Sequence, residues 1–302
     1  MKNQQQKLKA FLFAVLLTSS IKVVSQTPHF STVPNLQRGD SISITYLIKN
    51  GTKASKGKVI GWFPKDSLSR EQMDKILDTL NIGVVAAERF IKAPYAWQVQ
   101  QVGKPYTFYF RLDSFVSHAS GAGFVSIPFW RLKQGKAPWL HEAIHEMLNT
   151  KAGNWLNDSI PEDVWAKNMP LWLAEGLPDY ISMQVSEQYN LPIFDVFTNS
   201  FLTNVDSVCK EDLKERRSDS ILSFIGNKGA MSGLFGKERR LYAPTFYHCS
   251  CSFVKYLAEQ FGADPLIESL SAYPNEMEQL EKGISTSIQE LKNRWLAKIE
   301  GR

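Results

Sequence analysis

Cysteine is scarce in this chain and never takes the Cys-x-x-Cys spacing typical of zinc bound by sulfur. The 302 residues hold three cysteines, Cys209, Cys249 and Cys251. A zinc site built from thiolates therefore has no support in the sequence. An odd count leaves one thiol over if a disulfide forms. Cys249 and Cys251 are too close in sequence to pair comfortably with each other, so a bridge from Cys209 to either of them, and no bridge at all, both stay open.

Long hydrophobic runs are also lacking, apart from one near the N-terminus. It extends from Ala10 to Leu17 and continues more weakly to Ile21, which is short of the roughly 20 apolar residues that span a bilayer. Three lysines precede it and small residues follow it, an order typical of a secretory signal peptide. We expect a signal peptide over residues 1–25, cleaved before Gln26. The mature protein would then be exported, periplasmic or extracellular, with no membrane span.

The chain has little excess charge of either sign. Its formal charge of +5 includes four lysines in the first 25 residues, where no acid occurs, so the remainder carries a net charge of about +1. Such a balance gives no electrostatic reason to expect nucleic acid or an anionic membrane as a partner. With 43% hydrophobic and 22% charged residues, the composition is that of a globular protein rather than a disordered one.

Hydrophobic periodicity predicts an α+β protein with strands first and helices after. A period of two indicates strands at 41–49, 58–63, 106–112 and 123–129. A helical period, with capping-box patterns at Ser69/Gln72 and Ser287/Glu290, indicates helices at 67–91, 138–150, 170–188, 246–261, 264–272 and 285–299. The polar stretches 151–169 and 225–244 are expected to be loops. No internal repeat is visible.

The motif His141-Glu142-Ala143-Ile144-His145 carries the chemistry. Residues four apart stand on one face of a helix, so the two imidazoles can bind a single zinc ion. Glu142 follows the first of them directly, where it could take a proton from water at the metal. A catalytic zinc needs a third protein ligand and leaves a fourth position open.

The stretch Trp172-Leu-Ala-Glu175-Gly-Leu-Pro-Asp179-Tyr180 offers that ligand. Together the two motifs resemble the gluzincins, the metallopeptidase group of thermolysin and aminopeptidase N, over about residues 120–300. The resemblance implies that Glu175 is the third ligand and that Asp179 hydrogen-bonds a zinc-bound histidine. Pro178 departs from the family pattern. It is expected to kink the helix, and a kink that turned Glu175 away would abolish the site.

The same resemblance implies a zincin-like fold and a catalytic tyrosine. Residues 26–302 would form one catalytic domain, with a lobe of sheet and active-site helix over 26–150 and a helical lobe over 151–302. Tyr247, at the expected start of a helix, would hydrogen-bond the developing oxyanion, with His248 and Tyr242 as alternatives. The implied function is a zinc-dependent metallopeptidase acting on peptides or proteins, with one Zn²⁺ and Glu142 as general base. The alternative is a catalytically inactive zinc-binding module that binds protein or peptide.

Overall fold

The computed structural model places most of the chain after residue 39. The described residues are 40–92, 105–113, 117–119, 123–148, 170–191, 201–215, 218–228, 239–270, 272 and 275–301. All of them belong to one compact unit, Arg38–Arg302. The expected signal peptide and the polar stretch 151–169 lie outside the described residues. No helix in the described part of the chain is long and apolar enough to cross a membrane.

A five-stranded mixed sheet forms the N-terminal part of this unit, in the order β1-β2-β3-β5-β4. The central strands β2, β3 and β5 are parallel, whereas β1 and β4 pair antiparallel at the two edges. The strands span Thr52–Lys56 (β1), Val59–Phe63 (β2), Tyr106–Arg111 (β3), His118–Ala119 (β4) and Phe124–Pro128 (β5). The sequence prediction is confirmed for β2, β3 and β5.

The strand expected at 41–49 is wrong, because these residues form helix α2, Asp40–Asn50. The alternation of Ile and Tyr suggested a strand with one buried face. In the helix, Leu47 is the side chain that enters the core, while Tyr46 and Ile48 are exposed. The helix packs against β1, β2 and β3, so contact with the sheet decides its conformation. Its last turn closes with the N–H of Gly51 on the carbonyl of Leu47, at 2.7 Å.

The helices expected from the sequence all form, with shifted bounds, and others accompany them. They are α3 (Arg70–Ile91), α4 (Phe129–Lys133), α5 (Trp139–Leu148), α7 (Leu171–Gln188), α8 (Phe201–Glu215), α9 (Ser218–Leu222), α11 (Arg239–Phe261), α12 (Asp264–Leu270), α13 (Glu276–Ile284) and α14 (Ile288–Glu300). The start of α11 corrects the expected loop at 225–244. The helices α4, α8, α9 and α13 were not predicted from the sequence.

The two predicted capping boxes have different outcomes. At α3 both bonds of the box between Ser69 and Gln72 are present. At α14 Ser287 is the residue that precedes the helix, but its side chain makes no capping bond. Glu281 of α13 instead accepts the N–H of Ile288, the first residue of the helix, at 2.9 Å. The first turn of α14 is therefore capped by the preceding helix rather than by its own serine.

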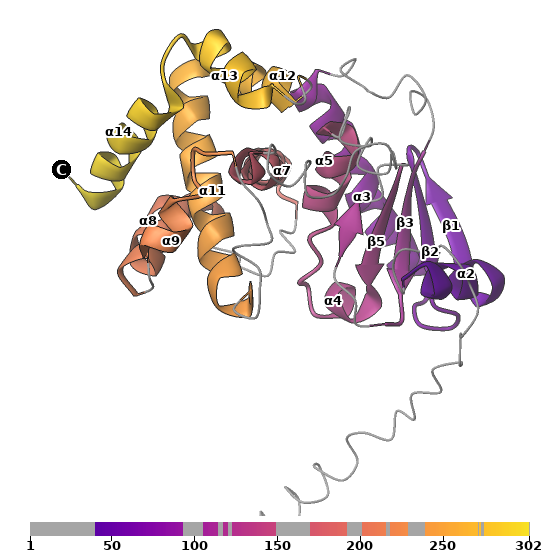
Figure 1. Cartoon of the computed structure of the whole chain (residues 1–302). Coiled ribbons are helices and arrows are strands. Elements are labelled where there is room, and N and C mark those ends of the chain that lie inside the picture. Colours follow the sequence, from indigo (N-terminus) through magenta and orange to yellow (C-terminus); the bar gives the residue numbers. More distant parts are fainter. Residues whose placement is uncertain are drawn as a thin grey trace, which may run out of the picture. The chain divides into compact units, whose positions relative to one another are not determined.

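The helices succeed one another away from the sheet (Figure 1). Helix α5 contacts β5, α3 and α7, and α7 in turn packs along α11. Fully buried tryptophans mark this progression, with Trp139 in α5, Trp172 in α7 and Trp295 in α14. A small mixed sheet and a majority of helical residues in the described part of the chain are compatible with the expected α+β class. Helix α7 lies between α5 and α11, and this position decides what its side chains can reach.

Candidate metal centre

Helix α5 holds the two histidines of the motif on one face. Leu140, Ala143 and Ile144, which lie outside that face, are buried in the core and anchor the helix. The Nε2 atoms of His141 and His145 are 2.9 Å apart, and their rings meet nearly edge to face, with centroids 4.5 Å apart. The spacing of four residues therefore brings two ring nitrogens to one point, as the sequence predicts.

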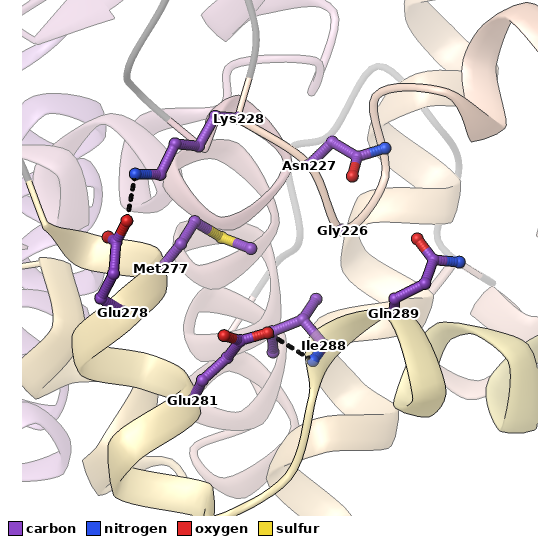
Figure 2. Close-up of a pocket in the computed structure, with 8 residues that line it drawn as sticks. All are labelled: Gly226, Asn227, Lys228, Met277, Glu278, Glu281, Ile288 and Gln289. Carbon is purple, nitrogen blue, oxygen red and sulfur yellow. Dashed lines mark hydrogen bonds and ion pairs between the residues drawn. The ribbon is translucent and has the colours of Figure 1, made fainter.

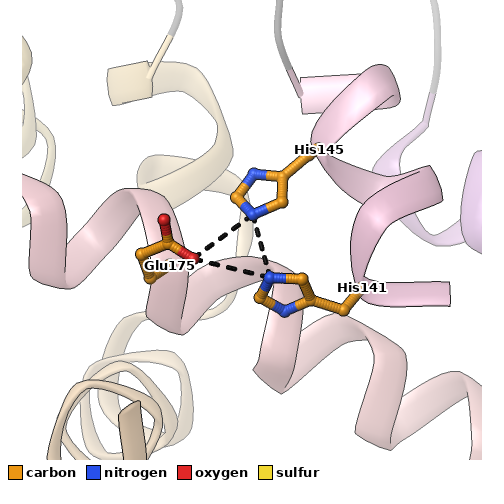
Figure 3. A group of neighbouring side chains, drawn as sticks. All are labelled: His141, His145 and Glu175. Atoms are coloured by element: carbon orange, nitrogen blue, oxygen red, sulfur yellow. Dashed lines mark hydrogen bonds and ion pairs between the residues drawn. The ribbon is translucent and has the colours of Figure 1, made fainter. Parts of the chain in front are cut away.

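Helix α7 adds Glu175 to this pair. Its Oε2 is 3.5 Å from Nε2 of His141 and 3.4 Å from Nε2 of His145. Figure 3 shows the carboxylate of α7 facing both imidazoles of α5. Pro178 lies inside α7, but the helix runs on to Gln188 and Glu175 still faces the histidines. The proline does not remove the third candidate ligand.

The three side chains fit a zinc ion in both spacing and chemistry. Their ligating atoms all lie within 4.8 Å of one another. A tetrahedral zinc with bonds of roughly 2.0–2.1 Å places its ligand atoms about 3.3 Å apart, close to the 2.9–3.5 Å found here. Two imidazoles and one carboxylate leave a fourth position open, the pattern of catalytic rather than structural zinc. The three side chains are only 13–16% exposed, so the site is enclosed yet reachable.

Asp179 lies behind His141 and orients its ring. Its Oδ1 is 2.7 Å from Nδ1 of His141, and the imidazole N–H donates to the carboxylate. A neutral imidazole with its proton on Nδ1 carries its lone pair on Nε2, the atom that faces His145 and Glu175. The expected role of Asp179 thus has the geometry that a buried partner of a metal ligand requires.

The charges at this site favour a cation. Burial alone lowers the pKa of His141, but the charge and hydrogen bond of Asp179, aided by Glu175 and Glu142, raise that pKa well above its usual range. Burial likewise raises the pKa of Glu175, yet its hydrogen bonds to His141 and His145 lower that pKa far below the usual value. Buried carboxylates that stabilise a positive charge on neighbouring groups would also stabilise a divalent cation.

The two acids of α5 have different places. Glu142 is 8% exposed, and its charge contributes to the raised pKa of His141. Glu146 is completely buried and accepts the N–H of Gly123 at 2.7 Å, so it ties α5 to the start of β5. The sequence predicts the helix that carries Glu146 and the strand that begins near Gly123. It did not reveal that these two residues meet.

Tyr247 of α11 lies beside the histidines, with its ring 6.5 Å from that of His141. It does not begin a helix as expected, because α11 starts at Arg239. Its alternative His248 is buried and hydrogen-bonds Asp212 of α8 at 2.6 Å, so it belongs to a helix interface. The side chain of Tyr242 lies outside what the structure describes. Of the two whose side chains are described, Tyr247 is the one that lies at the site.

A separate hollow of about 290 Å³ lies between the turn at Gly226 and helices α13 and α14 (Figure 2). Lys228 pairs with Glu278 across it, and Glu281 caps α14. None of the residues that the sequence singled out lines it. Its charged side chains are used in holding the helices together, so the candidate chemistry stays with the group on α5 and α7.

Comparison with protein-family models, characterised proteins and solved structures finds no match for this chain. The interpretation of the site therefore depends on its residues and their geometry.

Proposed function

We propose that this protein is a zinc metallopeptidase of gluzincin type with a zincin-like fold. The convergence of His141, His145 and Glu175 from two helices carries the proposal. Asp179 supports it, since a buried carboxylate behind a histidine is typical of metal sites. The mixed sheet packed against α5, with the remaining helices beyond α7, is compatible with that fold.

Glu142 and Tyr247 supply the groups that peptide hydrolysis requires besides the ligands. A zinc ion held by the three ligands would lower the pKa of water and polarise a carbonyl. Glu142, next to His141, takes the proton from the attacking water and passes it to the leaving amine. Tyr247 donates its O–H to the carbonyl oxygen as negative charge develops there. The substrate class that this set fits is a peptide or protein.

The N-terminal segment adds a location to the proposal. A cleaved signal peptide over residues 1–25 would export the enzyme to the periplasm or the extracellular space. The catalytic domain would then comprise residues 26–302. N-terminal sequencing of the secreted protein should begin at Gln26, and a mature chain that retains Met1 would refute export by this route.

The metal content of the purified chain tests the site. Wild type and a Glu187→Ala control, altered at an exposed position of α7, should each hold one zinc. Glu175→Ala should lose most of it, because two histidines alone bind zinc weakly. Zinc retained fully in Glu175→Ala would show that another group is the third ligand. No zinc in wild type, even after zinc is added, would refute the metal site.

Hydrolysis is tested separately with a peptide library and zinc-loaded protein. Glu142→Gln should keep its zinc and lose cleavage by about 10²–10⁴-fold, the usual contribution of a general base. Cleavage unchanged in Glu142→Gln would remove this residue from the mechanism. Zinc-loaded wild type that cuts no peptide in the library would instead support a binding module without turnover.

A further inference from the structure

Helices α8 and α11 pack antiparallel and are held in register by polar pairs. Near one end of the contact, Asp206 of α8 accepts hydrogen bonds from Ser252 and Lys255 of α11, each at 2.6 Å. Near the other end, Asp212 pairs with His248 at 2.6 Å. Residue numbers rise along α8 as they fall along α11. The backbone register between the two pairs is therefore fixed from both sides.

Cys209 and Cys249 face each other at the middle of this contact. Both are completely buried, and their sulfur atoms are 2.7 Å apart. Atoms of this size that are not bonded prefer separations of roughly 3.5–4.0 Å or more, so the two sulfurs are closer than an ordinary nonbonded contact. A disulfide bond would bring the two sulfurs only about 0.7 Å closer together, to the usual bond length of roughly 2.05 Å.

The third cysteine has a different environment. Cys251 is also buried in α11, but its sulfur lies 3.1 Å from the thioether of Met183 in α7. A thioether forms no disulfide. The structure thus separates one facing pair from one remaining thiol, which accounts for the odd number of cysteines in a chain whose N-terminus is expected to direct export.

We propose that Cys209 and Cys249 form a disulfide bond that joins α8 to α11. The thiolate of one cysteine attacks the disulfide of an exchange partner, such as glutathione disulfide or a disulfide carrier protein, and releases one thiol of that partner. The second thiolate attacks the mixed disulfide at the sulfur of this chain and releases the partner's other thiol. The chain loses two electrons and two protons, and the partner disulfide is reduced to two thiols.

The bond forms before the core closes and then resists reduction. Buried thiols are out of reach of an exchange partner, and burial together with the contact to Cys209 raises the pKa of the Cys249 thiol well above its usual range. A thiol with a raised pKa provides little of the reactive thiolate. The disulfide would fasten α11 close to Tyr247, two residues before Cys249, and so hold this tyrosine near His141.

The test counts cysteines that react before and after reduction. The full chain is refolded in a glutathione redox buffer, then denatured and alkylated without reductant, digested and analysed by mass spectrometry. We expect one alkylated cysteine, Cys251, and a cross-linked pair of peptides that contain Cys209 and Cys249. Three alkylated cysteines, or a cross-link that includes Cys251, would overturn the proposal.

Two variants keep the test decisive if loss of the bond impairs folding. Cys251→Ala should retain the cross-link and show no alkylated cysteine. Its melting temperature should fall by up to about 10 °C when the disulfide is reduced, as expected for a disulfide between residues 40 positions apart. Cys209→Ala should show two alkylated cysteines and no such fall. Equal falls in both variants would count against the bond. None of these measurements depends on zinc or hydrolysis, so the outcome is separate from that of the proposed function.

Discussion

Replacement of Gly176 by alanine should loosen the contact between the two central helices. Gly176 follows Glu175 in α7, where the backbone of α11 comes very close. A Cβ atom at this position would lie 2.7 Å from both the carbonyl carbon and the carbonyl oxygen of Ser250. These are backbone atoms of a buried helix, so no change of rotamer relieves the clash, and α7 and α11 have to move apart.

The magnitude follows from two opposing effects. Forcing an extra carbon into a packed core costs typically about 1–3 kcal/mol, whereas alanine is better than glycine inside a helix by about 1 kcal/mol. We expect Gly176→Ala to lower the free energy of unfolding by up to about 2 kcal/mol. At this chain length such a loss lowers the melting temperature by about 4–8 °C. Because Glu175 moves with the helix, zinc affinity should fall as well.

Gly283→Ala is the matched control. Gly283 also lies inside a helix, α13, but a Cβ there would only touch Pro265 at 3.4 Å. This variant should be as stable as wild type or more stable by up to about 1 kcal/mol. Urea denaturation of both variants, with zinc titration alongside, makes the comparison. If Gly176→Ala proved as stable as Gly283→Ala, the close approach of α7 to Ser250 would not describe the protein in solution.

Two further predictions concern acids. Asp179→Asn should weaken zinc binding by about 10–100-fold in a chelator competition, because it removes the charge behind His141. The control Glu187→Gln, on the exposed part of α7, should leave the zinc affinity unchanged. A zinc affinity of Asp179→Asn within twofold of wild type would show that Asp179 does not have this role. Burial raises the pKa of the Glu276 carboxyl to about 7, above its value in the unfolded chain. The folded state therefore binds this proton more tightly than the unfolded state does, and the free energy of unfolding falls as the pH rises from about 4.5 to about 7. Glu276→Gln cannot ionise, so its stability relative to wild type should increase over that interval, by up to about 3 kcal/mol; a pH-independent difference in urea denaturation would contradict this.

The sequence predicted what depends on spacing along one element. The histidines of α5, the capping box of α3 and the strands β2, β3 and β5 follow from spacings of four, three and two residues, respectively. The α2 segment shows where that rule fails. Its alternating apolar residues fit a strand, yet contact with the sheet selects a helix in which Leu47 is buried. The facing cysteines could not be predicted either, since no pattern indicated that Cys209 lies on a helix.

The candidate centre consists of two pairs, each four residues apart, that meet across a helix interface. His141 and His145 come from α5, and Glu175 and Asp179 come from α7 on either side of Pro178. His141 contacts both acids, Glu175 through Nε2 and Asp179 through Nδ1. A single imidazole ring thus contacts α7 on both sides of Pro178. Spacing alone places each pair on one helix face. Their meeting depends on the packing of α7 between α5 and α11, where Gly176 permits a close approach to the backbone of Ser250. That packing is a property of the whole core.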